Sequence, residues 1–353
     1  MQSTIQIHFF DIASEVIAIS TYFFLSKQKH YSYPTCFRFT TLTYIYLINH
    51  IPMTSSYYSI KDLENLTGIK AHTIRMWEQR YGIIKPDRTD SNIRLYGTDE
   101  LKLMLNIALL NNNGFKISRI AQMTSGEVNE KVLETIQKNS SYEDQINALT
   151  VSMIDLEEDQ FERIMSSNIL QYGFEKTMIH IIYPFLTRIG TLWMTASINP
   201  AQEHFISNLI RQKIIVAIDG YFEPNRINPK KFMLFLPEGE LHEIALLFAS
   251  YLAKSRGNKV IYLGQSLPLH DVIEVNKIHH VDYIFCIITS TPSSDQVQNY
   301  VNSLSASFPE AHILLSGYQV VGQDIQTPNN VTIMTTINQM IEFVEELKKE
   351  RKN

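Results

Sequence analysis

The segment Tyr58–Met104 reads "YSIKDLENLTGIKAHTIRMWEQRYGIIKPDRTDSNIRLYGTDELKLM" and carries the clearest signals of local structure in the chain. Ser59 is suited to cap a short helix over Ile60–Thr67, because its hydroxyl can accept a backbone N–H and acidic residues follow in the first turns. Gly68 breaks this helix, as a tight turn between two helices requires. A second helix is predicted over 71–80. The order of these segments predicts a helix-turn-helix.

The second helix is expected to have a buried and an exposed face. Ile74 and Trp77 lie three positions apart and are predicted to face the core. The residues predicted to face outward are His72, Thr73, Arg75 and Arg80. The loop Lys85–Arg94 that follows is typical of a wing. Thr98 or Asp99 is predicted to cap a third helix, in which apolar residues recur at helical spacing.

This stretch resembles the MerR family of DNA-binding regulators, in its CarA/CarH/MlrA-like branch. The resemblance covers residues 54–125 and rests on Trp77–Gly82 (WEQRYG), together with Pro86, Arg88, Arg94 and Tyr96. It implies that Thr73 and Arg75 enter the major groove of double-stranded DNA, while side chains of the wing grip phosphates. The predicted DNA-binding residues are Thr73, Arg75, Arg80, Arg88, Arg94 and Tyr96.

The charge distribution agrees with a module that meets a polyanion. Residues 54–125 carry ten Lys/Arg against seven Asp/Glu, whereas residues 126–353 carry eighteen against twenty-seven. A basic block ahead of an acidic body favours binding of nucleic acid by the first of them. Because few phosphate contacts bind weakly per copy, a dimer or tetramer on a palindromic operator is expected.

The beginning of the chain is unusual. Residues 1–53 are rich in Phe, Tyr, Ile and Thr but show no sustained period. Asp11 and Glu15 interrupt their apolar part before it reaches membrane length, and no basic segment precedes it as in a secretory signal. We expect a disordered or mis-annotated extension, with translation starting at Met53. A membrane-associated extension is the alternative.

Cysteine usage bears on the compartment. The two cysteines, Cys36 and Cys286, form no CxxC pair. This argues against a disulfide framework or a zinc-finger site. It suits a reducing cytoplasm, so a cytoplasmic protein is expected. No membrane partner is expected.

Residues 127–225 are predicted to form a helical bundle, with breaks at Gly173, Pro184, Gly190 and Pro200. Asn199 and Gln202 mark a helix start. One spacing stands out, because Trp193 is followed after nine residues by Glu203 and His204.

This spacing resembles a motif of cobalamin-binding regulators, in which a helical bundle lies over the upper face of the corrin. The resemblance implies that Trp193 shields the upper axial group and that Glu203 and His204 line the same surface. Ordinary helix packing is the alternative. Members that sense light tend to carry a His just after the Trp, where this chain has Met194.

Residues 230–350 alternate between short apolar runs and helical segments. The predicted strands are 232–236, 260–263, 283–288, 313–315 and 331–334, and the predicted helices are 240–256, 270–279, 295–308 and 337–349. This alternation predicts a parallel sheet covered on both faces. The fold class expected for this region is α/β, Rossmann-like (flavodoxin-like). Ligands of such sheets lie beyond the carboxyl ends of the strands, where Glu240 and His242 fall.

The same segment resembles the cobalamin-binding domain, whose signature is Asp/Glu-x-His-x-x-Gly, then Ser-x-Leu, then Gly-Gly. Glu240-x-His242 fits the first element, which implies that His242 is the lower axial ligand of cobalt and that Glu240 bonds its other ring nitrogen. The remaining elements appear as Ala245, Ser290-Thr291-Pro292 and Ser316-Gly317. Glycine at the last site would let the backbone approach the nucleotide tail. The predicted cofactor-binding residues are Trp193, Glu203, His204, Glu240, His242, Ser290 and Gly317.

Three classes of function can be compared with these patterns. The leading hypothesis is a transcriptional regulator whose C-terminal half senses a corrinoid such as adenosylcobalamin, with light as a further input. A regulator of the same build whose C-terminal half serves only in oligomerisation or protein interaction is the alternative. A corrinoid enzyme is not expected, because no nucleophile elbow, phosphate loop or zinc triad is visible in the sequence.

Overall fold

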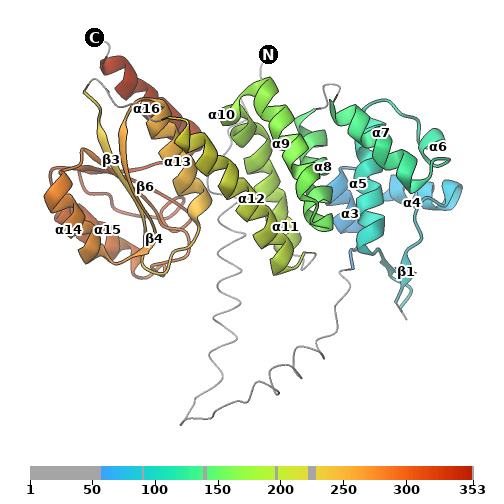
Figure 1. The fold of residues 1–353 in the computed structure, drawn as a ribbon. Helices are drawn as coiled ribbons and strands as arrows, with labels where there is room; N and C mark the ends of the chain where they lie inside the picture. The colour runs from blue at the N-terminus through green and yellow to red at the C-terminus, as the bar shows by residue number, and fades with distance from the viewer. Residues whose placement is uncertain (1–56, 90, 138–140, 195–197, 222–227, 352–353) are drawn as a thin grey trace, which may run out of the picture. The chain divides into compact units, whose positions relative to one another are not determined.

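The computed structural model describes residues 57–89, 91–137, 141–194, 198–221 and 228–351 (Figure 1). They form two compact units, of which one ends at Glu203 and the other begins at His204. The extension predicted over 1–53 lies outside the described residues. Within the described ranges, none of the helices has the length and apolar character needed to cross a membrane.

The first unit opens with the predicted helix-turn-helix, formed by α3 (Ile60–Thr67) and α4 (Ala71–Tyr81). The Ser59 hydroxyl accepts the Asp62 N–H at 3.2 Å, and the Asp62 carboxylate accepts the Ser59 N–H at 2.7 Å. Gly68 ends α3 with φ 71°, a conformation that glycine adopts without strain. The wing is an antiparallel pair, β1 (Asp87–Arg88) and β2 (Arg94–Leu95).

Helix α5 (Thr98–Asn112) follows the wing and packs against α3. Its N-cap is Gly97, whose N–H is accepted by the Glu100 carboxylate at 3.0 Å. The prediction that Thr98 or Asp99 caps the helix is therefore wrong. The helix begins one residue earlier, because the Glu100 carboxylate already accepts the free N–H of Gly97. Most of α5 is buried, which identifies a helix enclosed by neighbours on all sides.

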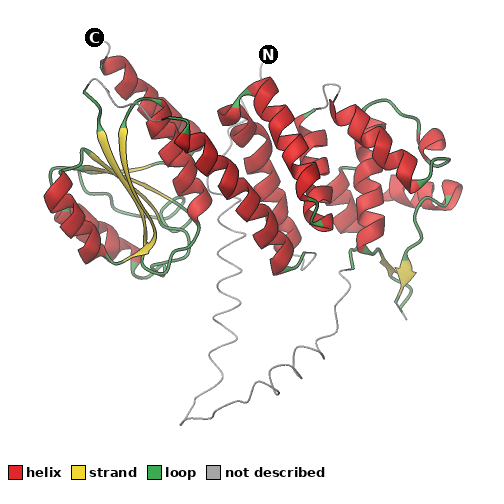
Figure 2. Ribbon diagram, viewed as in Figure 1, coloured by secondary structure: helices red, strands yellow, loops and turns green. Residues whose placement is uncertain are grey.

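Further helices complete this unit (Figure 2). They are α6 (Ile117–Ile120), α7 (Ser125–Gln137), α8 (Tyr142–Asp155), α9 (Glu158–Tyr172), α10 (Phe174–Thr177), the π-helical turn η1 (Met178–Ile182) and α11 (Tyr183–Met194). Lys102 of α5 pairs with Asp155 of α8 at 2.7 Å, and Asn113 donates to Asp144 at 2.9 Å. Helix α5 thus packs against α8.

Two of the helix breaks predicted in the middle region are wrong. Gly173 does separate α9 from α10, with φ 82°. Pro184 and Gly190, however, both lie inside α11. The π-helical turn η1 comes directly before Pro184, and such a turn can accommodate a residue that lacks an N–H. A single helical glycine costs only about 1 kcal/mol.

Helix α12 (Pro200–Asp219) begins as predicted. The Asn199 side chain accepts the Gln202 N–H at 3.0 Å, and the Gln202 side chain accepts the Asn199 N–H at 3.1 Å. The first residues of α12 belong to the first unit and the rest to the second. Sequence had placed domain boundaries at 125 and between 225 and 230, and these stay predictions.

The second unit contains a five-stranded parallel sheet in the order β4-β3-β5-β6-β7. Its strands are β3 (Lys231–Pro237), β4 (Lys259–Leu267), β5 (Tyr283–Ile287), β6 (His312–Ser316) and β7 (Val331–Ile333). The first strand pairs with the second on one side and the third on the other, so the order is that of flavodoxin-like sheets. The predicted fold class is confirmed.

Helices cover both faces of the sheet (Figure 1). They are α13 (Glu243–Ser255), α14 (Leu269–His279), α15 (Val297–Ser307) and α16 (Ile337–Glu350). Met233 and Phe235 pack in one core with side chains of α14 and α15. Phe232, one residue earlier, faces the other way and contacts Phe343 of α16. Because successive side chains of a strand point to opposite faces, a strand that is buried on both faces is apolar at every position.

Candidate functional site

The outward face of α4 has the residues that sequence placed there. Ile74 and Trp77 are buried, whereas Arg75 and Arg80 are exposed. Thr73 is half-buried. The helix therefore presents two arginines to solvent while its apolar side anchors it to the core.

The two arginines of the wing differ in their surroundings. Arg88 is exposed and donates to the Asn92 side chain at 2.7 Å. Arg94 is half-buried, and its Nε donates to the carboxylate of Glu78 at 3.0 Å. Because Glu78 belongs to α4, this ion pair fastens the wing to that helix. The Nε of Arg94 thus has an ionic partner, whereas Arg88 is exposed and has, among the described residues, only the neutral Asn92 as a partner.

Tyr96 does not lie on the surface. It is fully buried, and its backbone pairs with that of Tyr58 in an isolated antiparallel bridge. Burial, helped by the nearby carboxylate of Glu78, raises the pKa of Tyr96 to about 12. The predicted phosphate contact is wrong for this residue, because its side chain belongs to the core that supports the wing.

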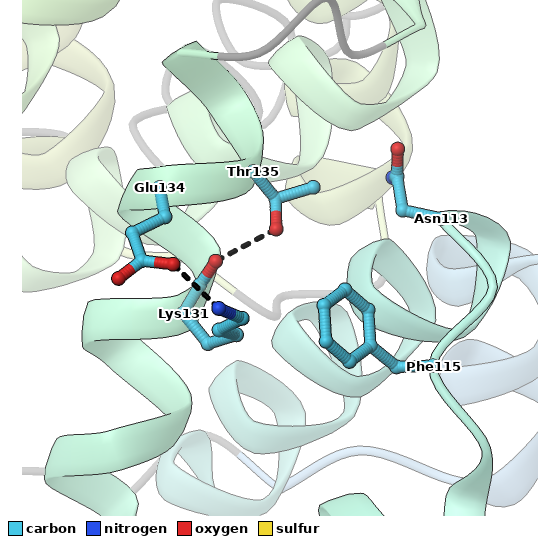
Figure 3. A pocket seen from close by; sticks show the side chains of 5 residues that line it. All are labelled: Asn113, Phe115, Lys131, Glu134 and Thr135. Atoms are coloured by element: carbon cyan, nitrogen blue, oxygen red, sulfur yellow. Dashed lines mark hydrogen bonds and ion pairs between the residues drawn. The ribbon is translucent and has the colours of Figure 1, made fainter.

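A hollow of about 210 Å³ lies where the end of α5 meets α7, lined by Asn113, Phe115, Lys131, Glu134 and Thr135 (Figure 3). Lys131 pairs with Glu134 at 2.5 Å and sits 5.7 Å from the centre of the Phe115 ring. The Thr135 hydroxyl donates to the Lys131 carbonyl. These polar groups satisfy one another, so the hollow is a feature of helix packing.

The second site lies where β3 and β5 end. The turn after β3 contains Glu240, whose side chain is fully buried. Its Oε2 accepts three successive backbone N–H groups from the loop after β5, those of Thr289 at 3.0 Å, Ser290 at 2.6 Å and Thr291 at 3.4 Å. The Ser290 hydroxyl adds a fourth bond at 3.1 Å. One carboxylate thus joins the two loops at the topological switch point of the sheet.

The other oxygen of Glu240 holds the histidine. Oε1 accepts the backbone N–H groups of Leu241 and His242 and contacts Nδ1 of the His242 ring. Burial would raise the pKa of Glu240, but the bonds from the His242 ring and from backbone N–H groups outweigh it and hold the pKa at about 2. The carboxylate is therefore ionised in the folded chain.

His242 is the N-cap of α13, which begins at Glu243 and not at Glu240 as predicted. The helix starts later because the Glu240 carboxylate turns inward to the β5 loop. The His242 side chain is 15% exposed. Its Nδ1 is engaged by Glu240, and no residue in the described ranges hydrogen-bonds Nε2. The geometry leaves one ring nitrogen for a ligand.

Sequence reasoning missed the residue next to this histidine. Glu243 is buried and accepts bonds from Tyr262 at 2.8 Å and Gln265 at 3.2 Å. It also pairs with Arg211 of α12 at 2.7 Å. These contacts fix the first turn of α13 and hold α12 against it. The motif pattern gives no weight to this position, and only the tertiary contacts reveal it.

The residues that depart from the expected glycines have structural explanations. The Ser316 hydroxyl is buried and donates to the Met334 carbonyl at 2.5 Å, so it is satisfied within the sheet. Gly317 has φ 107°, and a Cβ there would lie 2.6 Å from the carbonyl carbon of Ile288. The close approach that requires glycine is thus to the chain's own backbone. Ala245 is half-buried in α13.

The residues predicted to lie over the upper face of the corrin are at the end of α11 and the start of α12. Trp193 and Met194 lie at the end of α11, and their side chains are outside the described set. Glu203 is half-buried in the first turn of α12, and His204 beside it is exposed. Their role over a corrin stays a prediction.

Two families match this chain. Residues 58–127 match the family described as MerR HTH family regulatory protein, and residues 145–217 match the B12 binding domain. The HTH-type transcriptional repressor CarH of Myxococcus xanthus is 23% identical over 263 residues, which is 73% of this chain and 87% of CarH. The repressor CarA of the same organism is 26% identical over 59% of this chain and 68% of CarA.

A third relative matches a shorter region. The HTH-type transcriptional regulator MlrA of Escherichia coli (strain K12) is 33% identical over 70 residues, or 20% of this chain and 29% of MlrA. Together with the fold, these matches define a DNA-binding transcriptional regulator that carries a cobalamin sensor. Within that class the chain combines a MerR-type helix-turn-helix region with a B12 binding domain region.

Proposed function

We propose that the regulator binds adenosylcobalamin at the carboxyl edge of β3 and β5, where Nε2 of His242 would hold the cobalt. The observation that carries this proposal is the Glu240–His242 pair. A buried, ionised carboxylate engages Nδ1, which orients the ring and raises the basicity of the other nitrogen. Ser290 takes part by anchoring the carboxylate.

The residues present fit the group. The Ser316 hydroxyl is turned to Met334, so this departure from the signature places no new group in front of His242. Gly317 keeps the glycine of the signature and lies close to Ile288. Bound adenosylcobalamin would supply a cobalt–carbon bond that can be broken, by light among other causes. The chain's own residues orient the ligand, and a regulatory role, without catalysis, is the activity they support.

Sensing requires that the ligand bind two assemblies of the protein with different affinity. We place this difference in self-association, as a dimer or tetramer on a palindromic operator. A winged helix that offers few cations binds weakly alone, so affinity for DNA would follow the number of copies held together.

The histidine is tested by its removal. We expect His242→Ala to abolish the co-elution of corrinoid absorption bands with the full-length chain after incubation with adenosylcobalamin in the dark and gel filtration. His270→Ala is the matched control, because His270 is a highly exposed histidine in the first turn of α14. Retention of the same spectrum by His242→Ala would reject His242 as the cobalt ligand. Illumination of the loaded protein then tests for a light response.

Substitution of the two wing arginines should have different effects, one on DNA binding and the other on the free energy of unfolding. We expect Arg88→Ala to weaken binding to an operator duplex roughly tenfold at low salt and to reduce the salt slope by about 1, because one phosphate contact is lost. Arg94→Ala should instead lower the free energy of unfolding by about 1 kcal/mol, since Glu78 loses its partner. Salt-dependent anisotropy and urea unfolding measure the two. Equal salt slopes for both variants would contradict this assignment.

A further inference from the structure

One apolar side chain interrupts the polar face of α4. Met76 is 48% exposed, although the apolar residues that anchor the helix, Ile74 and Trp77, are buried. On a helix its surface neighbours are the residues three and four positions away. For Met76 these are His72, Thr73, Gln79 and Arg80, of which all but Thr73 are exposed. A thioether is thus surrounded by polar and cationic groups.

The surroundings of Met76 decide what can cover it. A surface that contains Arg75 and Arg80 suits a polyanion better than an apolar patch of another protein. In the major groove of DNA, the base edges offer hydrogen-bond donors and acceptors and a single apolar group, the C5 methyl of thymine. A flexible and uncharged side chain in the middle of the recognition helix matches that group.

We infer that Met76 is a specificity-determining residue, which contacts a thymine methyl in each half of the operator. The inference rests on the proposed placement of α4 in the major groove. It assigns to Met76 a preference for thymine that Arg75, whose guanidinium reads hydrogen-bond acceptors, does not provide.

The test uses the full-length chain and a duplex that it selects from a random pool. The duplex is resynthesised with deoxyuridine in place of each thymine in turn, which removes one methyl and preserves every hydrogen-bonding group. For the wild type, we expect one replacement per half-site to weaken binding about fourfold, the effect of exposing one buried methyl group. Met76→Ala should weaken binding to the thymine duplex similarly and no longer distinguish the two duplexes.

Two controls accompany it. Met76→Leu keeps an apolar side chain of similar size and should retain sensitivity to deoxyuridine. Leu170→Ala removes an apolar side chain on α9 that is 90% exposed, and it should behave as the wild type. The inference is overturned if the wild type ignores every replacement, or if Met76→Ala keeps the full sensitivity. It is also overturned if Met76→Ala alters only self-association. Failure to select any duplex would reject DNA recognition by α4 as well.

Discussion

Replacing Glu240 by alanine should lower the free energy of unfolding of the α/β unit by about 3–5 kcal/mol and abolish corrinoid binding. The carboxylate is the acceptor for three backbone N–H groups after β5 and two after β3, and all of them would lose it. Urea unfolding of the full chain measures the loss. Hydrogen exchange should accelerate first at the amides of Thr289–Thr291.

Glu238→Ala is the matched control, because Glu238 lies in the same turn but is exposed. We expect its effect to stay within about 0.5 kcal/mol. If both variants unfold alike, Glu240 is not what joins the two loops.

The same carboxylate should make stability depend on pH. Its pKa is about 2 in the folded chain against an ordinary value of 4.5. A depressed pKa contributes stability above pH 4.5 that is lost as the pH falls toward 2, by about 3 kcal/mol in all. Glu240→Ala should lack this component of the acid dependence. An unchanged acid profile in that variant would assign the dependence to other groups.

Gly317→Ala should also destabilise the unit by about 3–5 kcal/mol, because the new methyl group collides with the backbone of Ile288. Ile288 donates its N–H to Ser316 and accepts that of Gln319, so the clash cannot be relieved without opening the end of β5. Thr289 and Ser290 come next along the chain, and their N–H groups hold Glu240. Corrinoid binding should therefore weaken as well.

Gly322 provides the control for this substitution. It also has a positive φ, 75°, but a Cβ there would meet nothing within 4 Å. Gly322→Ala should cost about 1 kcal/mol, the effect of the backbone conformation alone. The difference between the two variants in urea unfolding measures the contact with Ile288. A difference near zero would mean that the loop after β6 moves freely away from Ile288.

Local signals in the sequence predicted local structure well. The cap at Ser59, the turn at Gly68 and the helix start at Asn199 depend on residues within four positions, and all three are confirmed. Pro184 failed as a signal because the preceding π-helical turn changes the hydrogen bonding that proline would otherwise break. The strand order of the sheet is a tertiary property that the alternation of strands and helices does not contain.

In the candidate site too, sequence predicted the contacts within one turn and did not predict the contacts between distant segments. The spacing of Glu240 and His242 indicated their pairing, because both lie in one turn. The N–H groups from the loop after β5 and the Arg211–Glu243 pair join segments distant in sequence, and no local pattern reveals them. Tyr96 was assigned to the surface by its motif, whereas its bridge to Tyr58 places it in the core.

On α4, the residues that hold the fold are different from those that face outward, and this bears on how such regulators evolve new targets. Ile74 and Trp77 anchor the helix and Glu78 holds the wing, while Arg75, Met76 and Gln79 face outward. Substitutions in the second group should leave folding almost untouched, since exposed positions contribute little to stability. After a gene duplication, a few codon changes could therefore give one copy a new set of target genes, with its ligand response inherited intact.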